Sequence, residues 1–164
     1  MQPRFVDTMP VYVEPSFPDV PDTRFIVKIK KLCPDAVTPS QSNPSDAAFD
    51  LYSVQDAQIA PQTRQLIKTG ISIQIPFGFY GQILGRSGLA LKKGICILGG
   101  VIDSGYLGEI CVIMYNSDCS RSHEVKKGDR IAQIVFLECK SAIFQEVEQL
   151  SVSSRGANGF GSTG

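Results

Sequence analysis

The sequence predicts an all-β domain, a sandwich or barrel, with one short helix. Apolar runs are short and turn-forming residues separate them, since the 164 residues include 15 glycines and 10 prolines. Ile67, Thr69, Ile71, Ile73 and Ile75 alternate with polar residues or glycine, as in a strand that is buried on one face. Short strands joined by frequent turns are characteristic of sandwiches and barrels.

The other expected elements follow in order along the chain. Residues 1–22 contain five prolines, which exclude a helix and disfavour a central strand, so we expect an extended or disordered arm. Residues 34–45 are rich in Pro, Ser and Asn and are expected to form a loop. Strands are expected at residues 25–32, 67–75, 79–84, 95–98, 123–125, 130–137 and 143–147. From residue 151 the composition predicts a loose tail.

The helix is expected at residues 88–93, directly after Gly85-Arg86-Ser87. Its residues are good helix formers, and Gly94 is suited to end it. Ser87 is a candidate N-cap. The same arrangement would also direct backbone amides and the Arg86 side chain toward a phosphate group.

Asp103 and Tyr106 lie in a glycine-rich segment, residues 99–109, between two apolar runs. This pattern predicts a β-hairpin whose arms flank a tight, glycine-permitted turn. Glycine lets a ligand approach the backbone closely. The hairpin is therefore a candidate nucleotide pocket in which Asp103 activates a water molecule.

Composition excludes several classes of partner and location. The 16 basic and 16 acidic side chains balance, so no basic surface for nucleic acid or a membrane is indicated. No apolar run approaches the roughly 20 residues that span a bilayer, and no secretory leader opens the sequence. The five cysteines form no CxxC pair, which predicts buried free thiols in a reducing compartment. We therefore expect an intracellular protein, cytoplasmic or nuclear.

Some catalytic chemistries are also excluded. His123 is the single histidine and is expected to be solvated beside a turn, so neither a Ser-His-Asp triad nor a Cys/His zinc site is indicated. The phosphate-binding loop GxxxxGK[ST] does not occur. Phosphate chemistry would therefore depend on carboxylates, arginine, hydroxyl groups and backbone amides, most simply with Mg²⁺.

Five short stretches combine polar side chains with small residues: 46–51, 85–88, 99–109, 128–133 and 155–164. Taken singly, each has a structural interpretation, such as a turn-capping aspartate, a helix cap or a flexible linker. In the last stretch a phenylalanine stands among glycines, after an arginine and before Ser-Thr. Such a segment is suited to act as a lid over a base and phosphates.

Together these stretches resemble the five motifs of the trimeric dUTP pyrophosphatase (dUTPase) family, from about residue 25 to the C-terminus. The most specific matches are residues 86–90, 100–106, 128–133 and 155–164. The resemblance implies a distorted jelly-roll-like β-clip fold, with a domain at residues 23–150 and a lid at 151–164. It also implies a homotrimer whose sites draw on all three chains. The implied reaction hydrolyses dUTP to dUMP and pyrophosphate, which limits uracil incorporation into DNA and supplies dUMP for dTMP synthesis.

The resemblance implies a role for each residue of the candidate hairpin. Asp103 would orient and deprotonate the attacking water. Tyr106 would pack on the deoxyribose and exclude a 2′-hydroxyl group. The backbone around Gly100, Ile102 and Cys111 would hydrogen-bond the uracil edge, and the narrow pocket would exclude the methyl group of thymine.

The remaining motifs are implied to hold the triphosphate. Arg86, Ser87, Gly88 and Gln133 would contact the phosphates, and Asp50 would hold water on the Mg²⁺ ion. In the lid, Arg155 would meet phosphate and Phe160 would stack over the uracil. Gly161, Ser162 and Thr163 would close over the γ-phosphate.

The sequence departs from the family pattern at two positions. Ala48 stands where the family usually has glycine, which could shift Asp50 slightly, and Leu107 replaces a frequent arginine. The sequence ends at Gly164, directly after the lid motif.

Three other functions compete with dUTP hydrolysis. A dCTP deaminase would share the fold, but it needs an acid near the base, and none is expected there. A nucleotide-binding or regulatory protein that no longer hydrolyses, and a purely structural trimer, would not need all five motifs intact.

Overall fold

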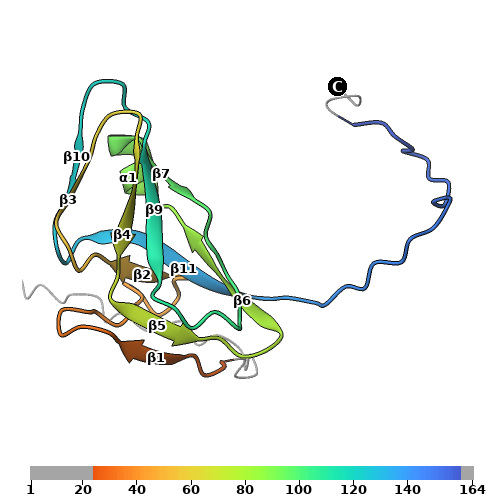
Figure 1. The fold of residues 1–164 in the computed structure, drawn as a ribbon, viewed down its shortest axis with the longest axis horizontal. Helices are drawn as coiled ribbons and strands as arrows, with labels where there is room; N and C mark the ends of the chain where they lie inside the picture. The colour runs from red at the N-terminus through yellow and green to blue at the C-terminus, as the bar shows by residue number, and fades with distance from the viewer. Residues whose placement is uncertain (1–23, 160–164) are drawn as a thin grey trace, which may run out of the picture.

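The computed structural model describes residues 24–159, which form eleven strands and one helix. Figure 1 shows these elements in chain order. They are β1 (Lys28–Lys31), β2 (Phe49–Tyr52), β3 (Ala57–Ile59), β4 (Arg64–Lys68), β5 (Ile71–Gln74), β6 (Phe79–Leu84), α1 (Ser87–Lys93), β7 (Ile95–Leu98), β8 (Val101–Ile102), β9 (Cys111–Asn116), β10 (His123–Val125) and β11 (Arg130–Glu138). The expected all-β fold with one short helix is confirmed.

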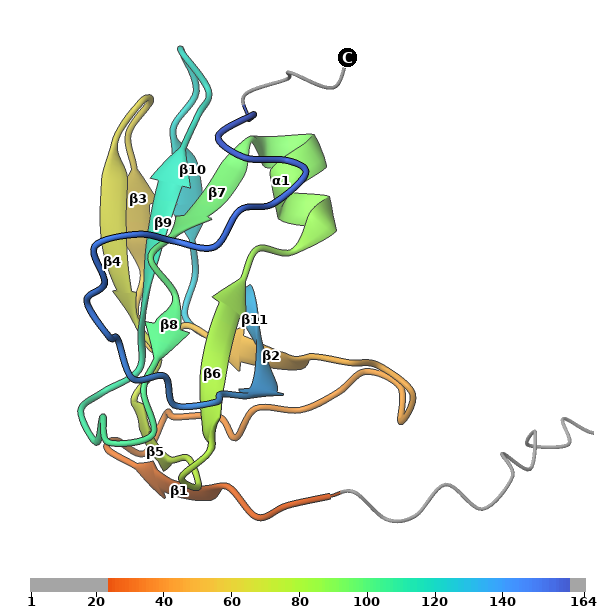
Figure 2. The same cartoon turned by 90° about the vertical axis from the view of Figure 1, so that its right-hand side faces the viewer.

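The strands form four small sheets in which every pair is antiparallel. Their strand orders are β1-β5, β10-β3, β2-β11-β6-β8 and β4-β9-β7. Figure 2 shows β3, β4, β9 and β10 on one side of the molecule, β6, β11 and β2 on the other, and β1 with β5 at one end. This is a sandwich-like, jelly-roll arrangement around a common core.

The core contains isoleucine, valine and leucine side chains from every strand except β1. Ile67, Ile71 and Ile110 are each at most 1% exposed, as are Val112 and Met114. Each full burial of such a side chain contributes about 1.5–3 kcal/mol. Because strands are short and alternate inside and outside, their outward residues remain free to line cavities on the surface.

The helix begins at Ser87, one residue before the expected start, and ends at Gly94 as expected. Gly94 adopts the left-handed conformation, with φ 64°, and its N–H donates to the carbonyl of Ala90 at 3.1 Å. The expected N-cap at Ser87 is wrong. Arg86 occupies that position, and its side chain caps no backbone N–H because a guanidinium has no acceptor; it pairs with Asp50 instead.

Residues 67–75 form two strands where the alternation predicts one. Gly70 interrupts the run with a φ of +67°, so β4 ends at Lys68 and β5 begins at Ile71. The two strands enter different sheets, since β4 pairs with β9 and β5 pairs with β1. The alternation survives the break because Thr69 and Gly70 turn the chain without changing which side chains face the core.

The hairpin expected around Asp103 is also wrong as a strand pairing. The run after the glycine-rich segment, β9, pairs with β7 and β4, whereas β8 pairs with β6. Gly99 and Gly100 have φ values of +69° and +110°, and they turn the chain from one sheet to the other. The Gly100 carbonyl then accepts a hydrogen bond from the N–H of Ile83 at 2.7 Å. A Cβ at Gly100 would lie 2.7 Å from the Ile83 oxygen, so a larger residue does not fit there.

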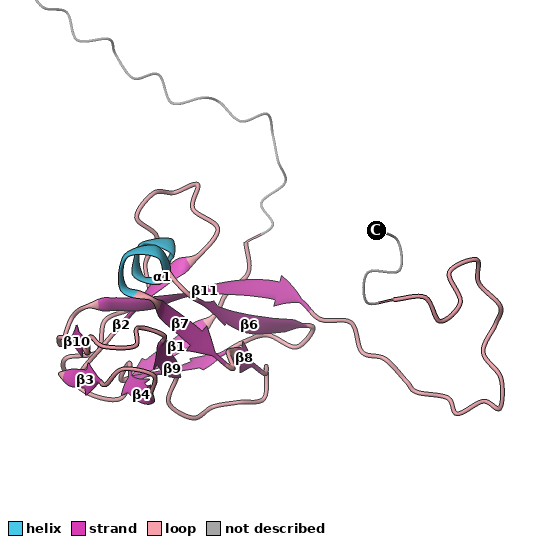
Figure 3. Cartoon of the chain, turned by 90° about the horizontal axis from the view of Figure 1, so that it is seen from above, coloured by secondary structure: helices cyan, strands magenta, loops and turns pink. Residues whose placement is uncertain are grey.

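The strand expected at residues 143–147 does not form. Residues 139–159 leave the end of β11 and run away from the sheets, as Figures 1 and 3 show from two directions. Ile143 and Phe144 are each 97% exposed. The apolar pattern that predicts a strand is real, but no part of the described chain covers it.

All five cysteines are free thiols, as expected, but none is buried. Cys33 and Cys111 are half-buried, and Cys96, Cys119 and Cys139 are exposed. The prediction of burial fails because Cys96 and Cys111 fall on the outward positions of β7 and β9. Within residues 24–159, no helix is long and apolar enough to cross a membrane.

Candidate active site

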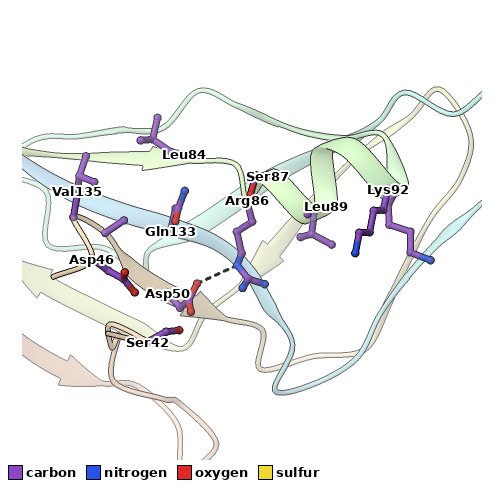
Figure 4. A pocket seen from close by; sticks show the side chains of 14 residues that line it. Ser42, Asp46, Asp50, Leu84, Arg86, Ser87, Leu89, Lys92, Gln133 and Val135 are labelled. Carbon is purple, nitrogen blue, oxygen red and sulfur yellow. Dashed lines mark ion pairs between the residues drawn. The ribbon is translucent and has the colours of Figure 1, made fainter. Parts of the chain in front are cut away.

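A cavity of about 690 Å³, the phosphate cavity, lies beside the start of α1. Figure 4 shows its side chains, which come from the loop before β2, from β2 itself, from the end of β6 and the turn that follows it, from the helix and from β11. Its lining includes Asp50, Arg86, Ser87, Gly88 and Gln133, all expected from the sequence to contact phosphate or Mg²⁺. Lys92 and Lys93 also line it, so cationic groups outnumber the carboxylates of Asp46 and Asp50. The cavity is therefore suited to an anion.

The Asp50 carboxylate lies between two guanidinium groups. Its Oδ1 is 3.0 Å from Nε of Arg86, and its Oδ2 is 3.2 Å from Nη1 of Arg130. Nη1 of Arg86 also donates to the carbonyl of Arg130 at 3.1 Å. Because the Asp50 side chain is only 11% exposed, this network holds both arginines more firmly than a surface ion pair would.

Sequence reasoning missed Arg130 as a residue of the site. It lies at the first position of β11, next to a turn, where an arginine is ordinary. Arg130 reaches the site through the pairing of β11 with β2, which places Arg130 and Gln133 beside the strand that carries Asp50. That pairing is tertiary information and cannot be read from the motif alone.

Gln133 is held at the floor of the same cavity. It pairs with Asp50 across the two strands, and its Nε2 donates to the carbonyl of Gly85 at 2.9 Å. This bond fixes the turn between β6 and α1. Ser87 and Gly88 directly follow this turn, and both are exposed.

A second cavity of about 250 Å³, the nucleoside cavity, lies between β8 and β9. Its lining combines a carboxylate, a tyrosine ring and strand residues: Leu66, Val101, Ile102, Asp103, Tyr106, Glu109, Cys111 and Ile113. Asp103 is exposed and the Tyr106 ring is 45% exposed. Both side chains can therefore be reached by a ligand.

The turn at Gly99 and Gly100 opens a gap in strand pairing beside this cavity. The last partners of β7 and β9 are Leu98 and Ile113. Two steps further in the same register, Gly100 would stand opposite Cys111, but no backbone hydrogen bond joins them in residues 24–159. Opposite Gly100, the edge of β9 at Cys111 therefore lacks a strand partner, and an unpaired edge can hydrogen-bond a flat ligand; the Gly100 carbonyl itself is bound to the N–H of Ile83.

Glu109 lies in the nucleoside cavity, contrary to the expectation that no further acid is near the pocket. Its Oε1 accepts a hydrogen bond from the N–H of Gly70 at 2.9 Å. Burial, together with the negative charge of Glu109, raises the pKa of the Cys111 thiol above its ordinary 9.0. The thiol is therefore neutral at physiological pH.

A third cavity, of about 300 Å³, shares Arg86 with the phosphate cavity and is also lined by His123, Asp129 and Arg130. His123 is half-buried, so the expectation of a solvated histidine is wrong. It faces inward because it shares a strand face with the buried Val125. Burial, and then the charge of Lys93, lowers the pKa of His123 below 6.5, with Asp129 acting in the opposite direction.

The structure brings the predicted residues together in two groups but leaves the groups apart. The phosphate cavity and the nucleoside cavity have no residue in common. Arg155 lies on the exposed tail, where its Nε donates to the carbonyl of Asn158 at 3.0 Å. Phe160, Gly161, Ser162 and Thr163 lie outside the described residues. An all-β fold with one anion-binding cavity and one cavity lined by open backbone is the arrangement expected of a nucleotide-binding protein.

Comparison with known proteins defines the family. The dUTPase family model matches residues 35–164, so the chain belongs to the dUTPase family. The chain is 48% identical over 140 residues to the deoxyuridine 5′-triphosphate nucleotidohydrolase of Nautilia profundicola, covering 84% of this chain and 98% of that protein.

Two solved structures are also similar. The dUTPase of Staphylococcus bacteriophage 80alpha with dUPNHPP is 30% identical and has a TM-score of 0.80, covering 85% of this chain and 98% of that chain. A mutant dUTPase from phage phi11 of S. aureus, described as revealing the coordination of a structural Mg(II) ion, has a TM-score of 0.72. It is 23% identical and covers 76% of this chain and 98% of that chain, so it supports the fold alone.

Proposed function

We propose that this chain hydrolyses dUTP to dUMP and pyrophosphate, with Mg²⁺, at sites shared between the copies of a homotrimer. Family membership supports the reaction. The observation that carries the proposal is the gap in strand pairing between Gly100 and Cys111, with Asp103 and Tyr106 beside it. Such a site fits a base and a sugar but is too small for a whole triphosphate.

The nucleoside cavity would select the base and the sugar. Backbone groups around Gly100, Ile102 and Cys111 would take the place of strand pairing and bind the uracil edge. The Tyr106 ring would cover the deoxyribose and exclude a 2′-hydroxyl group. Fit alone distinguishes one methyl group by about 1–3 kcal/mol, so rejection of thymine requires the rigid backbone of the gap.

Asp103 would orient the attacking water and accept its proton. It is exposed and lines the nucleoside cavity, so a water molecule can reach its carboxylate. General base catalysis supplies about 10²–10⁴-fold. The remaining acceleration would come from positioning and from neutralisation of phosphate charge.

The phosphate cavity would hold the triphosphate through Arg86, Ser87, Gly88 and Gln133. In the described chain, Arg86 is already oriented by its ion pair with Asp50, so little ordering is required when phosphate binds. Arg130 would act in the same group, because it shares the Asp50 carboxylate.

The donor set fits a Mg²⁺ ion held through water. Each Asp50 oxygen contacts one arginine and keeps a further acceptor site, which could accept a hydrogen bond from a metal-bound water. Residues 24–159 contain no group of three or more His, Cys, Asp or Glu side chains that could hold a metal ion. Phosphate oxygens and water would therefore provide most ligands. When bound, Mg²⁺ supplies charge neutralisation of the phosphate oxygens.

A homotrimer would complete the site and cover exposed apolar surface. Leu66, Ile113 and Leu98 are in register on neighbouring strands and are 49%, 36% and 40% exposed. The tail carries further exposed apolar side chains at Ile143, Phe144 and Leu150. Both surfaces are suited to contact other copies of the chain. The lid residues Arg155, Phe160, Gly161, Ser162 and Thr163 would then close over a neighbour's site.

Intracellular location, in cytoplasm or nucleus, stays a prediction, supported by the five free thiols. The absence of nucleic-acid and membrane partners also stays a prediction. It is supported by the balanced charge of the chain.

A product assay tests the reaction. With Mg²⁺ present, we expect pyrophosphate release from dUTP and near silence with UTP, dCTP and dTTP. Ammonia release from dCTP would instead indicate a deaminase. Binding of dUTP without turnover would support the regulatory alternative.

Light scattering tests the assembly. We expect a particle of three 17.8 kDa chains at micromolar concentration. Ile113→Asp should lower the measured mass of the particle, because it places a charge on the apolar face that Leu66, Leu98 and Ile113 form. A monomeric wild-type protein with full activity would refute the shared site.

A further inference from the structure

The break between β4 and β5 leaves a backbone donor that no strand can pair. Gly70 is buried, and its positive φ takes it out of both strands. Its carbonyl accepts from the N–H of Leu32 at 2.7 Å. Its own N–H donates to Oε1 of Glu109, 39 residues away, at 2.9 Å. A buried N–H left without a partner is costly, so this carboxylate has a structural reason to stay in place.

Neighbouring bonds hold the rest of the loop against β5. Ser72 Oγ donates to the carbonyl of Leu107 at 2.8 Å, and the N–H of Ile110 donates to the carbonyl of Ile71 at 2.8 Å. The Thr69 hydroxyl donates to the carbonyl of Ile110. Residues 107–110 are therefore tied to the rigid sheet, and Glu109 provides a tie made by a charged side chain.

The same residue also holds the tyrosine ring. The Tyr106 hydroxyl donates to the main-chain carbonyl of Glu109 at 2.9 Å. The ring lies over Gly108, where an added Cβ would come within 3 Å of three ring and hydroxyl atoms. Glu109 thus joins Tyr106 on one side to Gly70 on the other.

We propose that Glu109 is a positioning residue that sets the discrimination between deoxyribose and ribose by fixing the Tyr106 ring. The inference rests on the proposed function, in which this ring excludes the 2′-hydroxyl group. Steric exclusion works only if the excluding group cannot move aside, and Tyr106 is 45% exposed. The Glu109 main-chain carbonyl holds the ring hydroxyl, and the Glu109 carboxylate, bound to Gly70, holds that part of the main chain in place.

The test compares kcat/KM for dUTP and for UTP in wild type, Glu109→Ala and Glu109→Gln. Glu109→Ala should lower the dUTP-to-UTP ratio about tenfold, the factor that corresponds to one hydrogen bond to a charged group. The change should come mainly from faster use of UTP. Glu109→Gln keeps an acceptor oxygen and should retain the ratio within about threefold.

Asp56→Ala is the matched control. Asp56 Oδ1 accepts the N–H of Lys127 at 2.8 Å, which is a similar carboxylate-to-backbone bond across a long sequence separation, away from the nucleoside cavity. Its loss should lower the melting temperature but leave the dUTP-to-UTP ratio unchanged. An equal fall of the dUTP-to-UTP ratio in Asp56→Ala would mean that general destabilisation explains the effect of Glu109→Ala, and it would overturn the proposal.

A double-mutant cycle keeps the proposal testable if Glu109→Ala folds poorly. Tyr106→Phe removes the hydroxyl that Glu109 holds but keeps the ring. The double variant Tyr106→Phe with Glu109→Gln should have the same dUTP-to-UTP ratio as Tyr106→Phe alone. The double variant with Glu109→Ala should lower the ratio by less than the two single effects combined, because both substitutions break the same link. Full additivity, or an unchanged dUTP-to-UTP ratio in folded Glu109→Ala, would overturn the proposal.

The two proposals fail in different ways. If the wild-type protein shows no dUTP turnover, the proposed function is wrong. If the wild-type protein discriminates between dUTP and UTP and Glu109→Ala discriminates equally well, only the inference about Glu109 is wrong.

Discussion

The phosphate cavity and the nucleoside cavity are built in different ways. The phosphate cavity presents side chains, and ion pairs orient them: Asp50 holds Arg86 and Arg130 from one buried carboxylate. The nucleoside cavity presents backbone, and it exists because two glycines turn the chain out of register with β9. Under the proposed function, phosphate charge would be recognised by charged side chains, whereas the base edge would be recognised by backbone amides and carbonyls at a fixed spacing.

This difference decides which substitutions each cavity tolerates. Changing a side chain in the phosphate cavity removes a contact directly. In the nucleoside cavity most side chains can change without altering the backbone groups, but a change that moves the turn would remove the cavity. Three experiments examine this contrast.

The largest effect is expected at Asp103, the one side chain of the nucleoside cavity proposed to take part in the chemistry. Asp103→Asn keeps the shape but loses the base, so kcat should fall by about 10²–10⁴-fold. KM for dUTP should change by less than about threefold, because the backbone still binds the base. Pyrophosphate release measures both constants. Full activity of Asp103→Asn would show that Asp103 is not the general base.

A smaller effect on a different constant is expected at Arg130, which does not line the phosphate cavity but shares the Asp50 carboxylate with Arg86. Arg130→Gln removes one of the two guanidinium groups on Asp50, so KM for dUTP should rise about tenfold while the dUTP-to-UTP ratio stays constant. Lys126→Gln, which breaks the exposed pair with Glu124, is the control and should change neither value. A lower dUTP-to-UTP ratio in Arg130→Gln would mean that the two cavities are not independent.

The smallest effect is a pH dependence of stability, which arises from His123 in the third cavity and from Cys111 in the nucleoside cavity. The lowered pKa of His123 means that the unfolded state binds a proton more readily, so stability is lost as pH falls below about 6.5. The raised pKa of Cys111, at the nucleoside cavity, acts only on the alkaline side, with stability lost as pH rises above 9.0.

Melting temperatures measured between pH 5 and pH 8 test the acidic limb. The variant His123→Gln should reduce the loss of stability at acidic pH, and only modestly, because the ring is half-buried. Cys111→Ser should leave the acid side unchanged. If His123→Gln and the wild-type protein lose the same stability between pH 8 and pH 5, His123 is not the group responsible.

Sequence reasoning works best where local signals are complete. Residues 79–84, 95–98 and 123–125 are strands with the expected bounds, and α1 ends at Gly94. In each case turn residues bound a run of strand or helix formers, so the chain close by decides the element. β3, with three residues, is too short to give such a pattern.

The errors arise where partners distant in sequence decide. Gly70 breaks a strand without disturbing the alternation, and Gly99 and Gly100 redirect β8 to β6 although the apolar runs suggest a hairpin. Residues 143–147 have strand composition but no partner in the described chain. The site shows the same limit. Motif residues can be recognised singly, whereas the sharing of Asp50 by Arg130 depends on how β11 pairs with β2.

The gap between Gly100 and Cys111 also affects how the amides of this region exchange with solvent. Amide hydrogens within paired strands exchange slowly because their hydrogen bonds must first open, whereas amides at an unpaired edge need no such opening. Amides at the gap are therefore expected to be poorly protected in the free protein. A bound uracil would protect these amides as a neighbouring strand does elsewhere in the sheet, so the substrate acts for a time as part of the fold.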